Sequence, residues 1–240
     1  MDLIRGGDSL LNMRRLPVSL KNKEVTMTTF DLKEVDALLS TTRAVRKRLD
    51  LDRSVEKSMI MDCIELSQQA PTGSNRQGWR WVVVTDTDKR KAIAEYYRKG
   101  IGTYLNSAKA EAEKKGALQD ARVFESAQYL ANHMQDVPVQ IIPCIETGHI
   151  ADDAPRRAWI GLGGSIFPAI WSFQLALRSR GLGSCITTLH LSYEKQVAEI
   201  IGVPKTVVQI ALLPVAYTKG NIFRPAVRPP VDEIVHWEHW

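Results

Sequence analysis

Two long stretches of the chain carry hydrophobic residues at helical spacing. From Val55 to Ala70, apolar side chains return at every third or fourth position, which predicts a helix with one buried face. From Trp159 to Arg180, apolar residues surround the predicted helix on nearly all sides. A helix of this kind must be covered on most sides, so it lies at the centre of the protein or in an interface between subunits. Gly181 follows directly and is typical of the left-handed residue that ends a helix.

Shorter runs of β-branched and other apolar residues predict strands at 81–85, 139–146 and 207–215. Proline has no N–H to donate to a neighbouring strand, so Pro143 predicts that the second strand lies at a sheet edge or at a bulge. A short helix is predicted from Glu194 to Ile201, because Gly202 and Pro204 follow it.

The stretch from about residue 89 to 134 is helical in pattern and highly charged. Gly100, Gly102 and Gly116 are expected to break it into segments. A polar helical excursion with glycine joints suits a lid over a binding site. A solvated surface hairpin is the alternative interpretation.

The two ends of the chain differ in composition from the middle. Residues 1–26 show no period and are expected to form a flexible N-terminal extension. Residues 221–240 carry several prolines, which favour an extended C-terminal arm over a central strand. The stretch 27–240 is then a single domain, long enough to bury a sizeable core.

The loop Ala70 to Trp79, with the sequence A-P-T-G-S-N-R-Q-G-W, is the richest in hydrogen-bonding groups. Pro71 ends the preceding helix, because proline lacks the N–H and disfavours helical geometry in the residue before it. Asn75 and Gln77 each present a planar amide that donates and accepts, which suits the edge of a flat heterocycle. The alternative is an ordinary loop between a helix and a strand.

A run of four cations lies within six residues, from Arg43 to Arg48. Such a run is typical of a solvated face, or it forms a clamp for phosphate, whose oxygens match guanidinium groups in charge and geometry. The net charge of +5 and the pI near 9.1 suit an anionic small molecule and do not indicate a nucleic-acid partner.

Several other classes of site find no support in the sequence. The three cysteines have no metal-binding spacing and indicate reduced, structural thiols in a cytoplasmic protein. The five histidines form no recognised metal motif, so no metal site is expected. No run approaches the roughly 20 apolar residues of a membrane span, and no secretory signal is expected. The residues around Ser184 do not match the hydrolase nucleophile motif.

Taken in order, four segments resemble the motifs of the flavin-dependent nitroreductases. T-R-A-V-R at 42–46 is similar to the family's R-R-S-x-R, and the loop 70–79 is similar to A-P-S-x-x-N-x-Q-P-W. The apolar helix that runs into G-L-G-S at 181–184 is similar to the family's long central helix. R-P-P-V-D-E-I-V at 228–235 resembles R-x-P-L-x-E-V-V. Two departures concern the phosphate site, because Thr42 stands where the family commonly has arginine and Ala44 where it has serine.

The resemblance implies an α+β fold with a central, mostly antiparallel sheet flanked by helices. It places the long buried helix at a homodimer interface and FMN between the two chains. It also implies three groups of cofactor-binding residues: a phosphate clamp, a loop contributed largely by the partner, and a segment along the flavin ring. These are Thr42, Arg43, Ala44, Val45, Arg46 and Arg228 for the first, Pro71, Thr72, Gly73, Ser74, Asn75 and Gln77 for the second, and Ile186, Thr187, Thr188 and Leu189 for the third.

The activity implied by the resemblance is that of an oxidoreductase that uses FMN. It would take hydride from NAD(P)H onto flavin N5 and pass electrons to a nitroaromatic, a quinone or a similar small-molecule acceptor, by a ping-pong mechanism. No residue of the protein is then required as a catalytic acid or base, because the flavin carries the chemistry. A reductive dehalogenase, a flavin-fragmenting enzyme and a non-catalytic flavin sensor or reservoir remain as alternatives.

Overall fold

The computed structural model describes residues 30–102, 104–147 and 153–240. Its core is one sheet, in the order β1-β2-β5-β3, with β4 paired to β2 beside β5. All the paired strands are antiparallel. The strands are β1 (Trp79–Val84), β2 (Val139–Glu146), β3 (Leu182–Ser184), β4 (Val207–Gln209) and β5 (Leu213–Tyr217). The predicted α+β class with a central antiparallel sheet is confirmed, whereas the expected extension at 1–26 lies outside the described residues.

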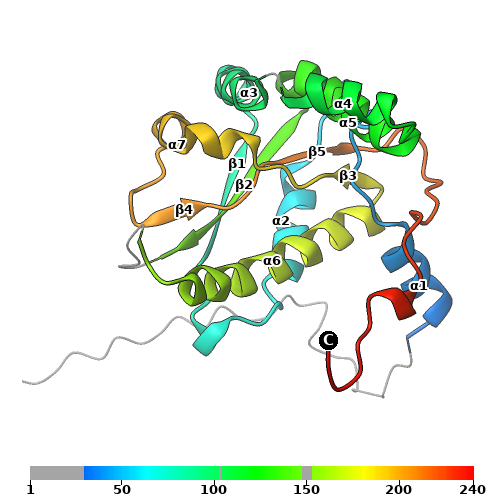
Figure 1. Ribbon diagram of the computed structural model, residues 1–240. Helices are drawn as coiled ribbons and strands as arrows, with labels where there is room; N and C mark the ends of the chain where they lie inside the picture. Colours follow the sequence, from blue (N-terminus) through cyan, green and yellow to red (C-terminus); the bar gives the residue numbers. More distant parts are fainter. Residues whose placement is uncertain (1–29, 103, 148–152) are drawn as a thin grey trace, which may run out of the picture.

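Helices cover both faces of this sheet (Figure 1). Helices α2 and α6 pack on one face, and α3, α5 and α7 on the other, while α1 lies against α6. The helices are α1 (Leu32–Thr41), α2 (Lys57–Ser67), α3 (Thr87–Ile101), α4 (Tyr104–Lys114), α5 (Leu118–His133), α6 (Arg156–Ser179) and α7 (Glu194–Ile201). Short 3₁₀ turns are η2 (Gly73–Asn75), η3 (Met134–Asp136), η4 (Leu189–Tyr193) and η5 (Val231–Glu233).

Strand β2 shows why the sheet is covered on both sides. Successive side chains of a strand point to opposite faces. Ile141 and Ile145 therefore join the core under α2 and α6, while Ile142 and Cys144 join the core under α3 and α5. This explains why its sequence is a nearly continuous apolar run rather than an alternating one.

The predicted bounds of one strand need correction, and of the two alternatives for Pro143 the bulge is supported: opposite Pro143, two residues of β2 face three residues between β4 and β5. Pro143 lies in the central strand rather than at an edge, with β1 on one side and β4 and β5 on the other. Its carbonyl accepts from the N–H of Ile210 at 2.9 Å, so its nitrogen faces the same side, where the partner chain is interrupted between β4 and β5. The predicted strand 207–215 is accordingly two short strands. The missing N–H of proline is tolerated because no regular ladder reaches it there.

Two helix predictions also need correction. The sequence placed Cys63 and Leu66 on the buried face of the helix 55–70. In α2, Cys63 is buried with Ile60 and Ile64, but Leu66 is 48% exposed, so the helical period is confirmed and the predicted buried face is partly wrong. Gly100 does not break its helix: it lies inside α3. The breaks fall at Gly102 and Gly116, which have φ angles of 51° and 69° and follow α3 and α4.

Helix α6 is long and apolar enough to cross a membrane by length and composition alone, contrary to the expectation from the sequence. The structure shows it as a core helix, because Ile166, Ile170 and Phe173 are fully buried against the sheet and α2. Its opposite side leaves Phe167 and Trp171 46% and 41% exposed. One face of α6 is thus left uncovered by the described part of a single chain.

Candidate functional site

The basic segment, Arg43–Arg48, begins just after α1 ends, and hydrogen bonds at Thr42 and Val45 hold it in place. The hydroxyl of Thr42 donates to the carbonyl of Leu38 at 2.6 Å, so this side chain closes the helix end. The N–H of Val45 donates to the carbonyl of Ser184 in β3 at 2.8 Å, and the Val45 side chain is buried. With Val45 turned inward, Arg43 and Ala44 are held at the surface.

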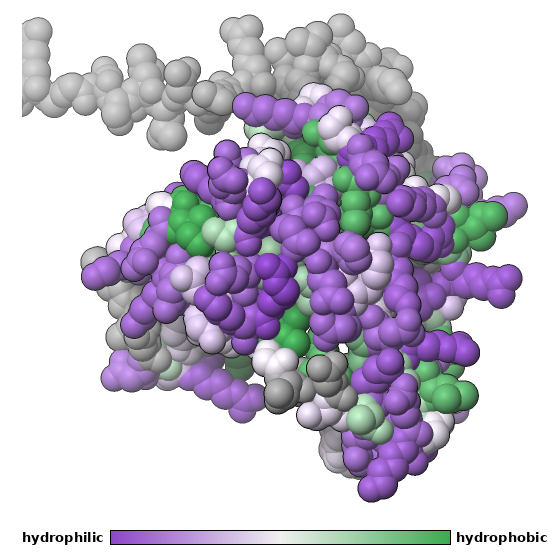
Figure 2. Space-filling view, turned by 90° about the horizontal axis from the view of Figure 1, so that it is seen from above, coloured by the Kyte–Doolittle hydropathy of each residue, from purple (hydrophilic) through white to green (hydrophobic). Residues whose placement is uncertain are grey.

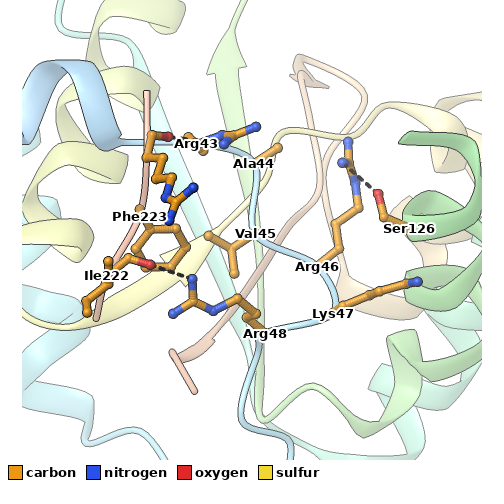
Figure 3. A pocket seen from close by; sticks show the side chains of 10 residues that line it. Arg43, Ala44, Val45, Arg46, Lys47, Arg48, Ser126, Ile222 and Phe223 are labelled. Atoms are coloured by element: carbon orange, nitrogen blue, oxygen red, sulfur yellow. Dashed lines mark hydrogen bonds between the residues drawn. The ribbon is translucent and has the colours of Figure 1, made fainter. Parts of the chain in front are cut away.

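A pocket of about 440 Å³ opens over this segment (Figure 3). Among the described residues that line it, five are cationic and none is acidic. The lining residues come from the basic segment, from α5 and from the start of the C-terminal arm. They are Arg43, Ala44, Val45, Arg46, Lys47, Arg48, Ser126, Ile222, Phe223 and Arg224. An excess of guanidinium groups over carboxylates favours a phosphate or another small anion.

The cations of the pocket differ in how far they are already engaged. Lys47 forms an ion pair of 2.6 Å with Glu125 of α5. Arg46 donates to the hydroxyl of Ser126 at 3.3 Å, so α5 helps to orient it (Figure 3). Arg43 donates from Nη1 to the carbonyl of Arg224 at 3.1 Å. Each of Arg43 and Arg46 keeps further N–H donors for a ligand, because a guanidinium has five.

Phe223 anchors the start of the C-terminal arm between two guanidinium groups. The guanidinium of Arg48 lies 4.0 Å from the centroid of its ring, and that of Arg178 lies 4.6 Å away. Arg48 also donates to the carbonyls of Lys219 and Ile222, at 2.9 and 2.8 Å. Burial, followed by the nearby charge of Arg48, lowers the pKa of Arg178. Arg48 and Arg178 thus hold the arm in place.

Of the two arginines on the arm, Arg224 lines the pocket and Arg228 lies outside it. Arg228 is exposed, and within the described residues its side chain donates only to the carbonyl of its neighbour Val227, at 3.1 Å. The sequence predicted Arg228 as a ligand and gave no prediction for Arg224, Phe223 or Ser126, while Arg48 was included only as part of the basic run. The basic run contained a signal for Arg48, whereas Ser126 becomes visible only when α5 is placed beside the segment.

The segment Ile186–Leu189 follows β3, in which Ser184 accepts the hydrogen bond from Val45, and its four residues are not among those that line the basic pocket. Its backbone is fixed at Thr187, which exchanges two hydrogen bonds with Leu212, of 3.1 and 2.7 Å. The Thr187 side chain points inward, while Ile186 and Thr188 are exposed. Leu189 packs against the core beneath α3.

The adjacent Cys185 is fully buried beside Arg46. Burial raises the pKa of its thiol to about 11, although Arg46 acts in the opposite direction. Burial likewise raises the pKa of Cys63 to about 11 and that of Cys144 to about 12. All three thiols are free, as the sequence indicated, and these pKa values make them poor nucleophiles at neutral pH.

The loop Pro71–Gln77 stands exposed and holds three residues in the left-handed region. Ser74, Asn75 and Gln77 have φ angles of 53°, 51° and 50°. Such angles are uncommon outside glycine, and an ordered run of them costs on the order of 1–3 kcal/mol per residue. The side-chain amide of Gln77 donates to Asn75 Oδ1 at 2.8 Å, and the N–H of Gln77 donates to the hydroxyl of Thr72 at 3.1 Å. Conformations of this kind cluster at functional sites.

In one chain, this loop does not meet the basic pocket. Gly73 is bonded to Ser165 in the first half of α6, whereas Thr41, beside the basic segment, contacts Arg178 near its end. With a rise of 1.5 Å per residue, these two positions on α6 are about 20 Å apart. Figure 1 shows the loop and α1 at opposite ends of α6. The structure therefore brings Thr42–Arg46 close to the chain that leads into Ile186–Leu189, whereas Arg228 and the loop stand apart.

Three comparisons with known proteins place the chain. It matches the Nitroreductase family over residues 39–217, whereas no curated protein matches it. Among solved structures, a nitroreductase-like family protein from Bacillus cereus is similar with a TM-score of 0.61 and 19% identity, covering 88% of this chain and 98% of its own.

Two further structures share the fold. The FMN and NADPH-dependent nitroreductase NfnB from sphigopyxis sp. strain HMH has a TM-score of 0.61 and 21% identity, covering 85% of this chain and 99% of its own. An iodotyrosine deiodinase bound to FMN and 3-iodo-L-tyrosine has a TM-score of 0.60 and 19% identity, covering 86% of this chain and 99% of its own. The family match spans well over half of the 240 residues, and this chain belongs to the Nitroreductase family.

Proposed function

We propose that this protein is an FMN-dependent oxidoreductase that oxidises NAD(P)H and reduces a nitroaromatic, a quinone or a similar acceptor in the cytoplasm. The observation that carries the proposal is the basic pocket, in which Arg43, Arg46 and Arg224 face one cavity without an acidic residue in its lining. Guanidinium groups arranged in this way fit the phosphate of a flavin mononucleotide. The neighbouring Ile186–Leu189 segment, in which Ile186 and Thr188 are exposed, would form the wall along the flat ring.

The protein's own residues would bind and orient the cofactor. Arg43 and Arg46 would donate charge-assisted hydrogen bonds to the phosphate, and Arg228 joins them on the strength of the resemblance. Thr42 has its hydroxyl engaged with Leu38, so it is a poor replacement for the arginine that the family commonly has there. Ala44 offers only its backbone. When bound, the flavin supplies the redox chemistry, in which its N5 accepts hydride from NAD(P)H and electrons pass on to the acceptor.

We further propose that two copies of the chain complete each site. Phe167 and Trp171 leave one side of α6 uncovered, and the strained loop Pro71–Gln77 stands about 20 Å along α6 from the basic segment. A second α6 packed against this face in a two-fold arrangement would cover the apolar side chains. It would also bring the loop of one chain toward the basic pocket of the other. The exposed arm from 221 to 240 would then contact the partner.

Donor and acceptor are proposed to use the same space in turn, by ping-pong kinetics. The sequence contains no separate dinucleotide-binding fingerprint that would give NAD(P)H a place of its own. The dehalogenase alternative keeps only the fold as support, because the deiodinase is 19% identical.

The test of cofactor identity is direct. Protein purified without added flavin, or reconstituted with it, is heated, and the released pigment is separated by chromatography. The proposal requires about one non-covalent FMN per chain, on the stoichiometry of one basic pocket per chain. Recovery of FAD, or a failure to bind any flavin after reconstitution, would reject the assignment.

A further inference from the structure

Helix α3 touches the predicted flavin-side segment at two positions one turn apart. The hydroxyl of Thr187 donates to the phenolic oxygen of Tyr97 at 3.1 Å. Three residues further along α3, a side chain at Gly100 would overlap the carbonyl oxygen of Leu189. Residues three apart on a helix lie on the same face, so one face of α3 supports the segment from Thr187 to Leu189.

The Tyr97 hydroxyl is unusual in its environment. The residue is 2% exposed and lies in the core cluster under α3, and burial raises the pKa of the phenol to about 12. A buried polar group without a partner is costly, so the tyrosine hydroxyl and the threonine hydroxyl hold each other in place. Phenylalanine would fill the same space, and the hydroxyl is therefore explained by its contact with Thr187 rather than by packing.

The contact settles which side chains of the segment face outward. Thr187 has its N–H and its carbonyl bonded to Leu212 and its hydroxyl bonded to Tyr97. With Thr187 turned inward, the alternation of an extended chain turns Ile186 and Thr188 outward, where both are exposed. If the segment shifted by one residue, Thr187 would face outward, and Ile186 and Thr188 would face inward.

We propose that Tyr97 is a positioning residue: through Thr187, and with the close approach of Gly100, it fixes the Ile186–Leu189 segment that forms one wall of the active site. The inference rests on the proposed function for the identity of the ligand at this wall. Because α3 leads directly into α4 and α5, and α5 contacts Arg46 through Ser126, the helical excursion supports both the ring side and the phosphate side of the site. In this proposal the excursion supports the site through α3 and α5.

The experiment compares Tyr97→Phe, Thr187→Val and the double variant in the full-length protein. The matched control is Tyr96→Phe, on the same helix, because the Tyr96 ring packs against Tyr193 and its hydroxyl has no hydrogen bond within the described chain. The first measurement is amide hydrogen exchange in peptides that cover residues 186–189. The second is the rate at which NAD(P)H reduces bound FMN, together with the FMN dissociation constant.

Each single variant should accelerate exchange in the segment about threefold to tenfold, the effect of one ordinary hydrogen bond. The double variant should be no worse than the singles, because both remove the same bond. The reduction rate should fall by a similar factor, while the dissociation constant stays within about twofold, since the phosphate contacts lie elsewhere. Gly100→Ala should act in the same direction, by displacing Leu189.

Exchange equal to that of Tyr96→Phe would overturn the proposal. Accelerated exchange with an unchanged reduction rate would also overturn it, because Tyr97 would then support the fold alone. If the unaltered protein binds no flavin, the proposed function fails and a role in positioning flavin fails with it. The exchange measurement still decides separately whether Tyr97 holds the segment.

Discussion

The guanidinium of Arg48 lies 4.0 Å from the centre of the Phe223 ring, and this contact joins two parts of the chain that are far apart in sequence. It connects the basic segment to the beginning of the C-terminal arm. Arg178 approaches the same ring at 4.6 Å, from the last turn of α6. The place where the arm leaves the domain is therefore set by an aromatic side chain held between two cations.

This arrangement predicts that Phe223→Leu weakens FMN binding without unfolding the domain. A cation–π contact is worth about 0.5–1 kcal/mol at partly exposed sites, and two are lost together. The dissociation constant for FMN should rise about fivefold to thirtyfold as Arg224 loses its fixed position. Fluorescence titration of the apoprotein measures this. Phe223→Tyr keeps the ring and should bind as tightly as the original, so an equal loss in both variants would contradict the role of the ring.

A second prediction concerns the phosphate ligands. Arg46→Ala should weaken FMN binding about tenfold to a hundredfold, because a charge-assisted hydrogen bond contributes about 1.5–3 kcal/mol. Riboflavin, which has no phosphate, should bind the variant and the original protein alike. The ratio of the two dissociation constants isolates the phosphate contribution, and a parallel loss for both ligands would place Arg46 elsewhere.

The same ratio of FMN and riboflavin dissociation constants shows which arginine of the arm, Arg224 or Arg228, binds the phosphate. The pocket predicts a larger loss of FMN affinity for Arg224→Ala than for Arg228→Ala, because only Arg224 lines it within one chain. A loss at Arg228 that equals or exceeds the loss at Arg224 would show that a second chain brings Arg228 to the phosphate. That result would favour the family resemblance over the single-chain geometry.

Stability at low pH provides a third prediction, from a histidine outside the site. His190 is fully buried, neither ring nitrogen has a hydrogen-bond partner within the described chain, and burial lowers its pKa to about 4. In the unfolded chain the imidazole has a pKa near the ordinary 6.5, so between about pH 6.5 and pH 4 it binds a proton that the folded protein does not bind. The free energy of unfolding should therefore fall as the pH drops from about 6.5 to about 4, by on the order of 3 kcal/mol.

Chemical denaturation at pH 7 and pH 4.5 tests this, with His190→Leu as the comparison. Glutamates such as Glu56 also titrate at low pH, because the hydrogen bond from Tyr217 lowers the pKa of Glu56. Their contribution is common to both proteins, so the difference between the two pH profiles belongs to His190. Identical profiles would mean that His190 is solvated or paired in solution.

Assembly provides a fourth prediction. Trp171→Glu would place a charge on the uncovered face of α6, at a cost of several kcal/mol if that face is buried in a dimer. Monomeric protein that has lost FMN is expected, and sedimentation with flavin absorbance followed at the same time detects both changes. Leu118→Glu is the control, because Leu118 is 66% exposed on α5. A folded Trp171→Glu monomer with full FMN content and activity would rule out a site shared between chains.

The sequence predicted where helices and strands lie along the chain better than it predicted which segments pack against them. Helix α7 was predicted with its observed bounds, because Gly202 and Pro204 mark its end in the sequence. For Pro143 the sequence left an edge and a bulge open, because the extra residue between β4 and β5 that decides for the bulge belongs to the partner strands. Gly100 was read as a break, because its role, a close approach to Leu189, depends on a segment some 90 residues away.

In the candidate site, too, residues with a local sequence signal could be predicted, and residues placed by long-range contacts could not. The basic run and the loop at 71–77 carry local signals that single residues reveal. Arg224, Phe223 and Ser126 have no such signal, because their importance comes from long-range contacts with Arg43, Arg48 and Arg46. The apolar residues of α6 predicted a helix at the centre of the protein or in an interface: Ile166, Ile170 and Phe173 place it in the core, while the exposed Phe167 and Trp171 leave an interface open.

The most direct test of the central claim is an anaerobic double-mixing experiment on the flavin-loaded protein. NADH or NADPH is added first, and the absorbance of oxidised flavin is followed until it bleaches. A nitroaromatic or a quinone is then added after removal of the spent nucleotide. The account predicts full bleaching, acceptor-dependent return of the colour, and parallel lines in steady-state double-reciprocal plots. Bound flavin that neither nucleotide bleaches, or that no acceptor reoxidises, would contradict the claim that this protein is an NAD(P)H-dependent oxidoreductase.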